Sequence, residues 1–158
     1  LTLQHIHKRK ETYKRTAMIE TFKRDLARGK YHENYILNIV KSKYSQAHII
    51  DGYFKDYDIY VPEVKFGIEV KSDEKSKYTN NIVIEIEFNS KPSALSTTKA
   101  KYWVIYDGYD YNWFLTNKIK DCIKDNKLSY VEFIGKGDTK SKKAYLIKKE
   151  MLYKYKEL

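Results

Sequence analysis

The sequence predicts an α/β domain in which helices flank a central mixed β-sheet. Apolar residues recur at helical spacing between positions 12 and 44, whereas most of the remaining chain consists of short β-branched and aromatic runs bounded by turn residues. A chain of 158 residues has the size of one domain, and no repeat or linker divides it. We therefore expect one domain, composed of a basic N-terminal helical arm over residues 1–28 and a main body over residues 29–158.

Two consecutive helices are predicted near the N-terminus. In residues 12–28 the apolar side chains form one narrow stripe, and the other faces of this helix are strongly basic. Gly29 favours a helix end, because glycine is a common residue just after the last helical turn. A second helix is expected from Tyr31 to Tyr44, with Glu33 in its first turn.

Short strands are predicted to dominate the rest of the chain. One mixed sheet is expected to contain strands over residues 47–50, 57–61, 67–71, 82–88 and 102–106. Residues 91–99 are expected to form a polar loop that opens a short helix. The remaining expected elements are a helix over 117–125, a strand over 130–134, a lysine-rich turn and a strand over 144–147.

Composition narrows the class of protein. The net charge of +10 favours a polyanionic partner such as nucleic acid or an anionic membrane surface, although codon bias in an AT-rich genome also enriches lysine. No apolar run approaches the roughly 20 residues that cross a bilayer, and the N-terminal residues contain no secretory signal. The single cysteine, Cys122, can form neither an internal disulfide nor a zinc site. We expect an intracellular protein without a membrane partner.

Residues 58–71, DIYVPEVKFGIEVK, contain the strongest chemical signal. Asp58 on one short strand, a turn, and Glu69 and Lys71 on the next strand predict a hairpin. Alternate residues of a strand share a face, so Glu69 and Lys71 point the same way while Val70 points into the core. Two neighbouring carboxylates repel each other unless a cation lies between them, and oxygen ligands suit magnesium or manganese. A lysine beside them completes a hydrolytic site.

The run NIVIEIEF repeats this alternation, with isoleucines on one face and Glu85 and Glu87 on the other. An acidic strand face is ordinarily the solvated side of a sheet, but here it follows the acidic hairpin. A one-residue change of register would move both glutamates away. The sequence therefore leaves open whether Glu85 or Glu87 faces the site.

These residues resemble the PD-(D/E)xK nuclease superfamily, which includes type II restriction enzymes, Holliday-junction resolvases and phage exonucleases. Asp58 resembles its first acid, and Glu69 and Lys71 resemble its ExK pair. Glu33, within GKYHE, is similar to the acid that many members place on the helix before the sheet. The order of elements over residues 29–106 resembles the common core, and KPSALSTTKAKYWV resembles a segment of phage and resolvase-like members. Tyr57 replaces the nominal proline before the first acid.

The resemblance implies a restriction-endonuclease-like core and metal-dependent phosphodiester hydrolysis. Mg²⁺ is the implied cofactor, with Mn²⁺ able to substitute, and Lys71 would orient water or stabilise charge and would not act as the general base. The candidate catalytic residues are Asp58, Glu69, Lys71, Glu33 and Glu85. The candidate metal ligands are Asp58, Glu69, Glu85 and the backbone carbonyl of Val70.

Three groups of residues are candidates for contacts with nucleic-acid phosphates. They are Thr97, Thr98 and Lys99 at the expected short helix, Lys14 and Arg15 on the arm, and Lys142 and Lys143 after the lysine-rich turn. An ordinary helix cap explains the first group equally well. The arm could instead support a dimer partner, or simply be a soluble basic helix.

We therefore expect a metal-dependent DNA endonuclease, junction-resolving or restriction-like and of phage or mobile-element origin. It would act on duplex or branched DNA as a homodimer, in the cytoplasm of a bacterial or phage-infected host cell, with no small-molecule cofactor beyond the metal. The alternatives are a non-catalytic DNA-binding module and an RNA nuclease on the same fold. Whether the acids bind metal distinguishes the non-catalytic DNA-binding module from the two nucleases.

Overall fold

One continuous helix, α1 (Leu3–Lys41), forms the N-terminal part of the computed structural model, which describes residues 2–52 and 56–157. The Thr2 side chain caps its first turn. Gly29 lies inside α1, so the prediction of two helices separated at Gly29 is wrong. Glycine inside a helix costs only about 1 kcal/mol, and the packing of the last turns of α1 on the body offsets this cost.

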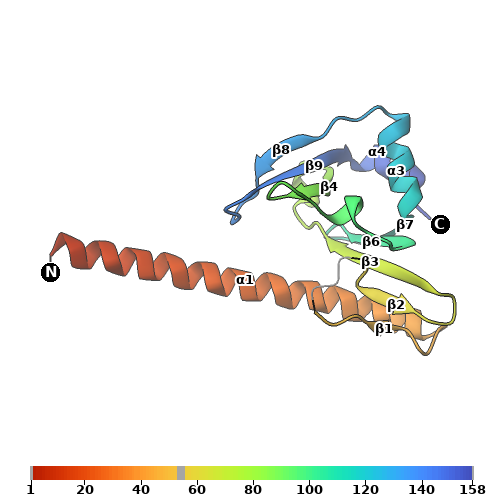
Figure 1. Cartoon of the computed structure of the whole chain (residues 1–158), viewed down its shortest axis with the longest axis horizontal. Helices are drawn as coiled ribbons and strands as arrows, with labels where there is room; N and C mark the ends of the chain where they lie inside the picture. The colour runs from red at the N-terminus through yellow and green to blue at the C-terminus, as the bar shows by residue number, and fades with distance from the viewer. Residues whose placement is uncertain (1, 53–55, 158) are drawn as a thin grey trace.

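The C-terminal part of α1 packs on the body, and its N-terminal part does not. Ile36, Val40 and His32 are buried, whereas every described side chain from Thr2 to Arg28 is exposed. Figure 1 shows α1 extending well beyond the rest of the molecule. Residues 3–28 are called the arm below, and the described residues from 42 onward, on which the last turns of α1 pack, are called the body.

The first sheet carries the hairpin that the sequence predicts. Its strand order is β1 (His48–Ile49), β2 (Ile59–Val61), β3 (Phe66–Ser72), β6 (Tyr102–Tyr106) and β7 (Tyr111–Leu115). The sheet is mixed, because β3 and β6 run parallel while the other neighbours run antiparallel. Strands β2 and β3 form the expected hairpin, and β7 is a strand that the sequence analysis did not predict.

A second, antiparallel sheet contains the remaining strands. Its order is β5 (Lys91–Pro92), β4 (Asn81–Phe88), β9 (Ser141–Lys148) and β8 (Val131–Ile134). The prediction of a single sheet is therefore wrong, because β4 pairs with β9 and the place beside β3 is taken by β6. A β-bulge interrupts the β4–β9 pairing between Glu85 and Glu87.

Short helical elements join these strands. They are α2 (Ser76–Thr79), the 3₁₀ turn η1 (Ala94–Ser96), α3 (Thr116–Asp125), α4 (Lys149–Leu152) and the 3₁₀ turn η2 (Tyr153–Tyr155). The expected helix opening within residues 91–99 is only the three-residue η1. None of the helices in the described residues combines the length and apolarity needed to cross a membrane.

Two apolar clusters cover the two faces of the first sheet. One joins the sheet to α1 and includes Ile36, Val70 and Val104. The other joins it to the second sheet and α3 and includes Trp103 and Ile84. The chain is thus an α/β protein with a mixed sheet, as predicted, and its central strands β3 and β6 lie between α1 and the second sheet (Figure 1).

Candidate active site

Asp58 lies immediately before β2 and not within it. Its backbone N–H donates to the carbonyl oxygen of Ile68 at 3.0 Å. Its Oδ2 atom accepts a hydrogen bond from the N–H of Val70 at 2.8 Å. Because β2 extends no further along β3, the Asp58 carboxylate satisfies a backbone donor that would otherwise lack a strand partner. The hairpin thereby holds Asp58 against the second half of β3, at an open edge of the sheet.

Glu69 and Lys71 share one face of β3, as the alternation predicts. In the parallel pairing with β6, Glu69 lies beside Trp103 and Lys71 beside Ile105, so both point toward the second sheet. Lys71 Nζ lies 2.9 Å from Glu69 Oε1 and 5.8 Å from the centre of the Trp103 ring. Glu69 is only 8% exposed. The carboxylate end of this ion pair is therefore largely removed from water, whereas the Lys71 side chain is 41% exposed.

Glu33 approaches the same strand end from α1. Burial, followed by the negative charges of Asp58 and Glu69, raises the pKa of Glu33 from 4.5 to about 7. A repulsion of this kind requires the three carboxyl groups to be close in space. The structure therefore brings Glu33 together with the two hairpin acids, although the acids are far apart in sequence.

The hairpin groups have coupled electrostatics. Burial raises the pKa of Asp58 against the opposing effects of the Val70 N–H and the Lys71 charge. Burial also raises the pKa of Glu69, again against the attraction of Lys71. Burial disfavours the charge on Lys71, but the carboxylates of Glu69, Asp58 and Glu85 outweigh it and raise the lysine pKa. Lys71 is thus a firmly protonated cation among acids that burial makes costly to ionise.

Glu85 on β4 is near enough to Lys71 for its charge to raise the lysine pKa, and Glu87 does not share its surroundings. Glu85 Oε2 accepts a hydrogen bond from Ser93 Oγ at 2.7 Å, and Oε1 lies 3.6 Å from Lys142 Nζ. Its charge acts on Lys71, which places it near the hairpin acids. Glu87 instead pairs with Lys143 at 2.9 Å. Of the two glutamates left open by the sequence, Glu85 is the one whose charge reaches the site.

Two supporting residues were not predicted from the sequence. Ser93 fixes the Glu85 carboxylate, and the Trp103 ring lies beneath the Lys71 ammonium group. A serine next to a proline and a tryptophan in an apolar run resemble ordinary turn and core residues, so the sequence offered no signal for either role.

The residues expected around the start of a short helix lie just after the 3₁₀ turn η1. Thr98 Oγ1 donates to the carbonyl oxygen of Asp56 at 3.1 Å and accepts from the Ala100 N–H. These bonds hold the backbone at Asp56 and Ala100 in place. Thr97 follows η1 and donates to the Ala94 carbonyl oxygen. Lys99 Nζ lies 3.8 Å from Asp56 Oδ2. The expectation of helix N–H groups at this position is wrong, because no α-helix begins there.

The other two basic groups differ in their surroundings. Lys14 and Arg15 lie on the exposed arm. Lys142 lies close to acids, 3.1 Å from Asp138 and 3.6 Å from Glu85, whereas Lys143 pairs with Glu87. The arm cations are therefore the more accessible of the two groups.

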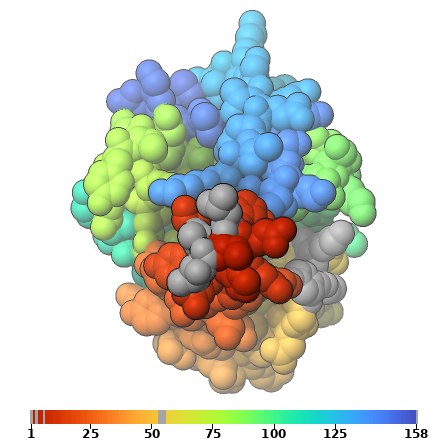
Figure 2. All heavy atoms as spheres, turned by 90° about the vertical axis from the view of Figure 1, so that its left-hand side faces the viewer, coloured from red at the N-terminus to blue at the C-terminus, as the bar shows by residue number. Residues whose placement is uncertain are grey.

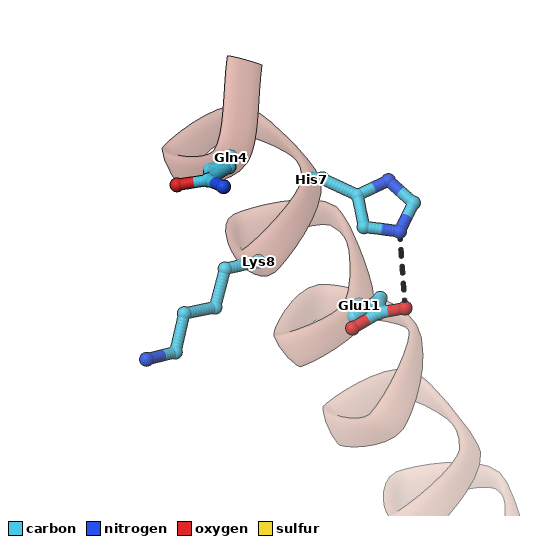
Figure 3. Close-up of a pocket in the computed structure, with 4 residues that line it drawn as sticks. All are labelled: Gln4, His7, Lys8 and Glu11. Atoms are coloured by element: carbon cyan, nitrogen blue, oxygen red, sulfur yellow. Dashed lines mark ion pairs between the residues drawn. The ribbon is translucent and has the colours of Figure 1, made fainter. Parts of the chain in front are cut away.

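A hollow near the free end of α1 is lined by Gln4, His7, Lys8 and Glu11 (Figure 3). His7 Nε2 and Glu11 Oε1 lie 3.2 Å apart and both side chains are exposed. One face of a single helix cannot enclose a ligand, and this hollow lies far along the arm from the acids of β3. We assign it no catalytic role.

The donor chemistry of the acidic cluster fits a hard divalent cation. Within residues 2–52 and 56–157, no three His, Cys, Asp or Glu side chains stand in ready metal-ligand geometry. However, Asp58, Glu69 and Glu33 are oxygen donors whose ionisation is disfavoured by burial and by their mutual repulsion. A divalent cation relieves both costs, and magnesium and manganese prefer carboxylate oxygen.

No protein-family model, curated protein or solved structure matches the chain. The chemical interpretation of the site therefore depends on its own residues and their geometry.

Proposed function

We propose that this chain is a divalent-metal-dependent endonuclease that hydrolyses phosphodiester bonds in DNA, with a restriction-endonuclease-like arrangement of its core. One observation carries the proposal: Asp58, Glu69 and Lys71 of one hairpin lie within electrostatic range of Glu33 on α1 and Glu85 on β4. Burying carboxylates costs folding free energy unless they are compensated. A cluster of this kind, drawn from three layers of the fold, is better explained by a catalytic role than by packing.

Asp58, Glu69 and the main-chain carbonyl of Val70 would hold Mg²⁺ or Mn²⁺. The Val70 N–H is directed at Asp58. The N–H and C=O groups of one strand residue point to the same side, so the Val70 carbonyl also faces the open edge of β3. Glu85 or Glu33 would complete the donor set. When bound, the metal would polarise the phosphate and lower the pKa of a water molecule.

The other site residues would control charge and protons. Lys71, held protonated by three carboxylates, would stabilise the negative charge that grows on the phosphate oxygens during hydrolysis. Glu33, whose pKa is about 7, would accept a proton at its carboxylate near neutral pH. Glu69 positions the Lys71 ammonium group through their 2.9 Å contact.

The charge distribution supports a nucleic-acid substrate. The chain carries a net charge of +10, and the arm presents exposed lysines and arginines beside an acidic site. We propose duplex or branched DNA as the substrate and a homodimer as the working form, which would allow two sites to cut opposing strands. Comparing cleavage of DNA and RNA substrates would reveal whether the protein is instead an RNA nuclease on the same fold.

A non-catalytic DNA-binding module is the second candidate. Two observations favour it: Lys71 already compensates Glu69 without a metal, and the described residues offer no ready three-ligand group. The module predicts nucleic-acid binding that does not depend on Mg²⁺. The nuclease predicts cleavage that does.

The test is cleavage of labelled linear duplex, four-way junction, single-stranded DNA and RNA, each with Mg²⁺ or with EDTA. Wild type would be compared with Asp58→Asn and with Asp56→Asn, a nearby acid whose side chain pairs with Lys99 outside the site. We expect metal-dependent cleavage by wild type and Asp56→Asn and its loss in Asp58→Asn. Tight binding without cleavage under any metal would favour the module.

A further inference from the structure

One continuous helix, α1, carries both the arm and the site residue Glu33. Glu33 lies on α1, and α1 continues without interruption through Gly29 to the free end of the arm. At 1.5 Å per residue, the helix axis between Glu33 and Lys8 is about 38 Å long. One turn of B-DNA spans about 34 to 36 Å, so the arm runs beside the site for about one turn of duplex.

The face of the arm that continues from Glu33 changes in character along its length. Seven-residue steps return to nearly the same side of a helix, so Lys8, Arg15 and Phe22 share a face, and Leu26 joins Glu33 on it. Every one of these four arm side chains is exposed. Moving outward from the site, this face is first apolar and then carries the two cations Lys8 and Arg15, with the acid Glu11 between them. It is called the site-facing side below.

The arm as a whole is strongly cationic. Its acids are few, whereas its basic residues surround the helix: Lys8, Arg9, Lys10, Lys14, Arg15, Lys23, Arg24 and Arg28 against Glu11, Glu20 and Asp25. Figure 2 views the molecule from the free end of the arm, with the C-terminal segments directly above it. The turn between β8 and β9, with exposed Lys136 and Lys140, projects on the same side of the body as the arm (Figure 1).

Self-pairing of the arm explains these features less well than a polyanion does. Further along α1, the site-facing side is covered by the body through Ile36 and Val40. A second arm running along Phe22 and Leu26 would meet the body near Gly29, and two arms of the same high positive charge would repel each other.

We infer that the site-facing side of the arm binds duplex DNA that flanks the cleaved phosphodiester, over about one helical turn and on one side of the cut. This inference rests on the proposed nuclease function and specifies its substrate as duplex next to the cut. Lys8 and Arg15 contact phosphates, while Phe22 and Leu26 lie nearer the site.

The test compares two double variants of the same helix. Lys8→Gln with Arg15→Gln removes two charges from the site-facing side, and Lys10→Gln with Arg24→Gln removes two exposed charges from the opposite side. Binding to a fluorescein-labelled 30-base-pair duplex is measured by anisotropy in EDTA, across a series of salt concentrations. Circular dichroism checks that both variants keep their helix content, and sedimentation velocity gives the oligomeric state.

Each lost phosphate contact lowers the slope of log affinity against log salt by about 0.9. The site-facing variant is therefore expected to lose about 2 from this slope, and the opposite-face variant less than about 1. Equal salt slopes for wild type and both variants would overturn the inference. It would also be overturned if wild type is a dimer and the site-facing variant is a monomer with an unchanged salt slope, because the arm would then be a dimer contact. Binding in EDTA does not require catalysis. If the salt slope depends on the arm but the protein cleaves no substrate, the nuclease proposal would be overturned and DNA binding by the arm would be supported.

Discussion

Replacing Glu33 by glutamine is expected to stabilise the metal-free protein at pH 8 and to change its stability little at pH 4. The folded state raises the Glu33 pKa from 4.5 to about 7, so it binds this proton more tightly than the unfolded state does. The penalty for ionising Glu33 is absent below pH 4.5, grows between pH 4.5 and 7, and is complete above pH 7. Glutamine keeps the shape of the side chain and removes this penalty.

The magnitude follows from the size of the pKa change. A rise from 4.5 to about 7 corresponds to an upper limit of roughly 3 kcal/mol at high pH. Partial exposure of Glu33 and relaxation of its surroundings reduce this, and we expect a gain of about 1 to 2 kcal/mol in the free energy of unfolding.

The assay is urea denaturation in EDTA, followed by circular dichroism at pH 4 and at pH 8. Glu20→Gln, on the exposed arm of the same helix, is the matched control and is expected to change stability by less than about 0.5 kcal/mol at both pH values. A Glu33→Gln protein less stable than wild type at pH 8, or a gain of equal size at both pH values, would refute the placement of Glu33 beside the hairpin acids.

Three further predictions concern the site and the fold. Lys71→Met should lower the cleavage rate constant by about 10² to 10³-fold, because the lysine stabilises charge on the phosphate. Mn²⁺ binding should persist, because the lysine is not a metal ligand. An unchanged rate constant would remove Lys71 from the mechanism. Gly29→Ala should raise the free energy of unfolding, measured by urea denaturation, by about 1 kcal/mol, since a Cβ at this helical position meets open space. A destabilised variant would contradict an unbroken α1. Gly67→Ala should lower it by about 1 to 3 kcal/mol, because a Cβ would overlap the Tyr57 side chain; a neutral result in the same denaturation experiment would contradict the packing of the hairpin.

The hairpin and its acids were predictable because the signals that specify them are local. Asp58 and Glu69 are separated by one turn, and strand alternation alone decides which side chains share a face with Lys71. Glu33 was predictable only through resemblance, since no local rule connects a residue of α1 with a distant hairpin. The start of the strand expected over residues 57–61 was placed two residues too early, because β2 begins at Ile59 and Asp58 precedes it.

The remaining errors have a common cause in long-range pairing. Alternation in β4 correctly identifies the buried Ile82 and Ile84, but it cannot say that the partner of β4 is the distant β9 and not β3. Strand β7 escaped prediction because the buried Asn112, which donates to the Ile105 carbonyl oxygen, interrupts its apolar pattern. Gly29 shows that a glycine ends a helix only where tertiary packing does not extend it.

The most direct test of the central claim is calorimetric titration of the full chain with Mn²⁺ at pH 7, without nucleic acid and in two buffers of different ionisation enthalpy. We expect one or two ions to bind with release of protons, because the ligands must ionise and burial disfavours their ionisation. Asp58→Asn should lose this binding and Asp56→Asn should retain it. Absence of binding in wild type, or equal binding by Asp58→Asn, would contradict a metal site at the open edge of β3.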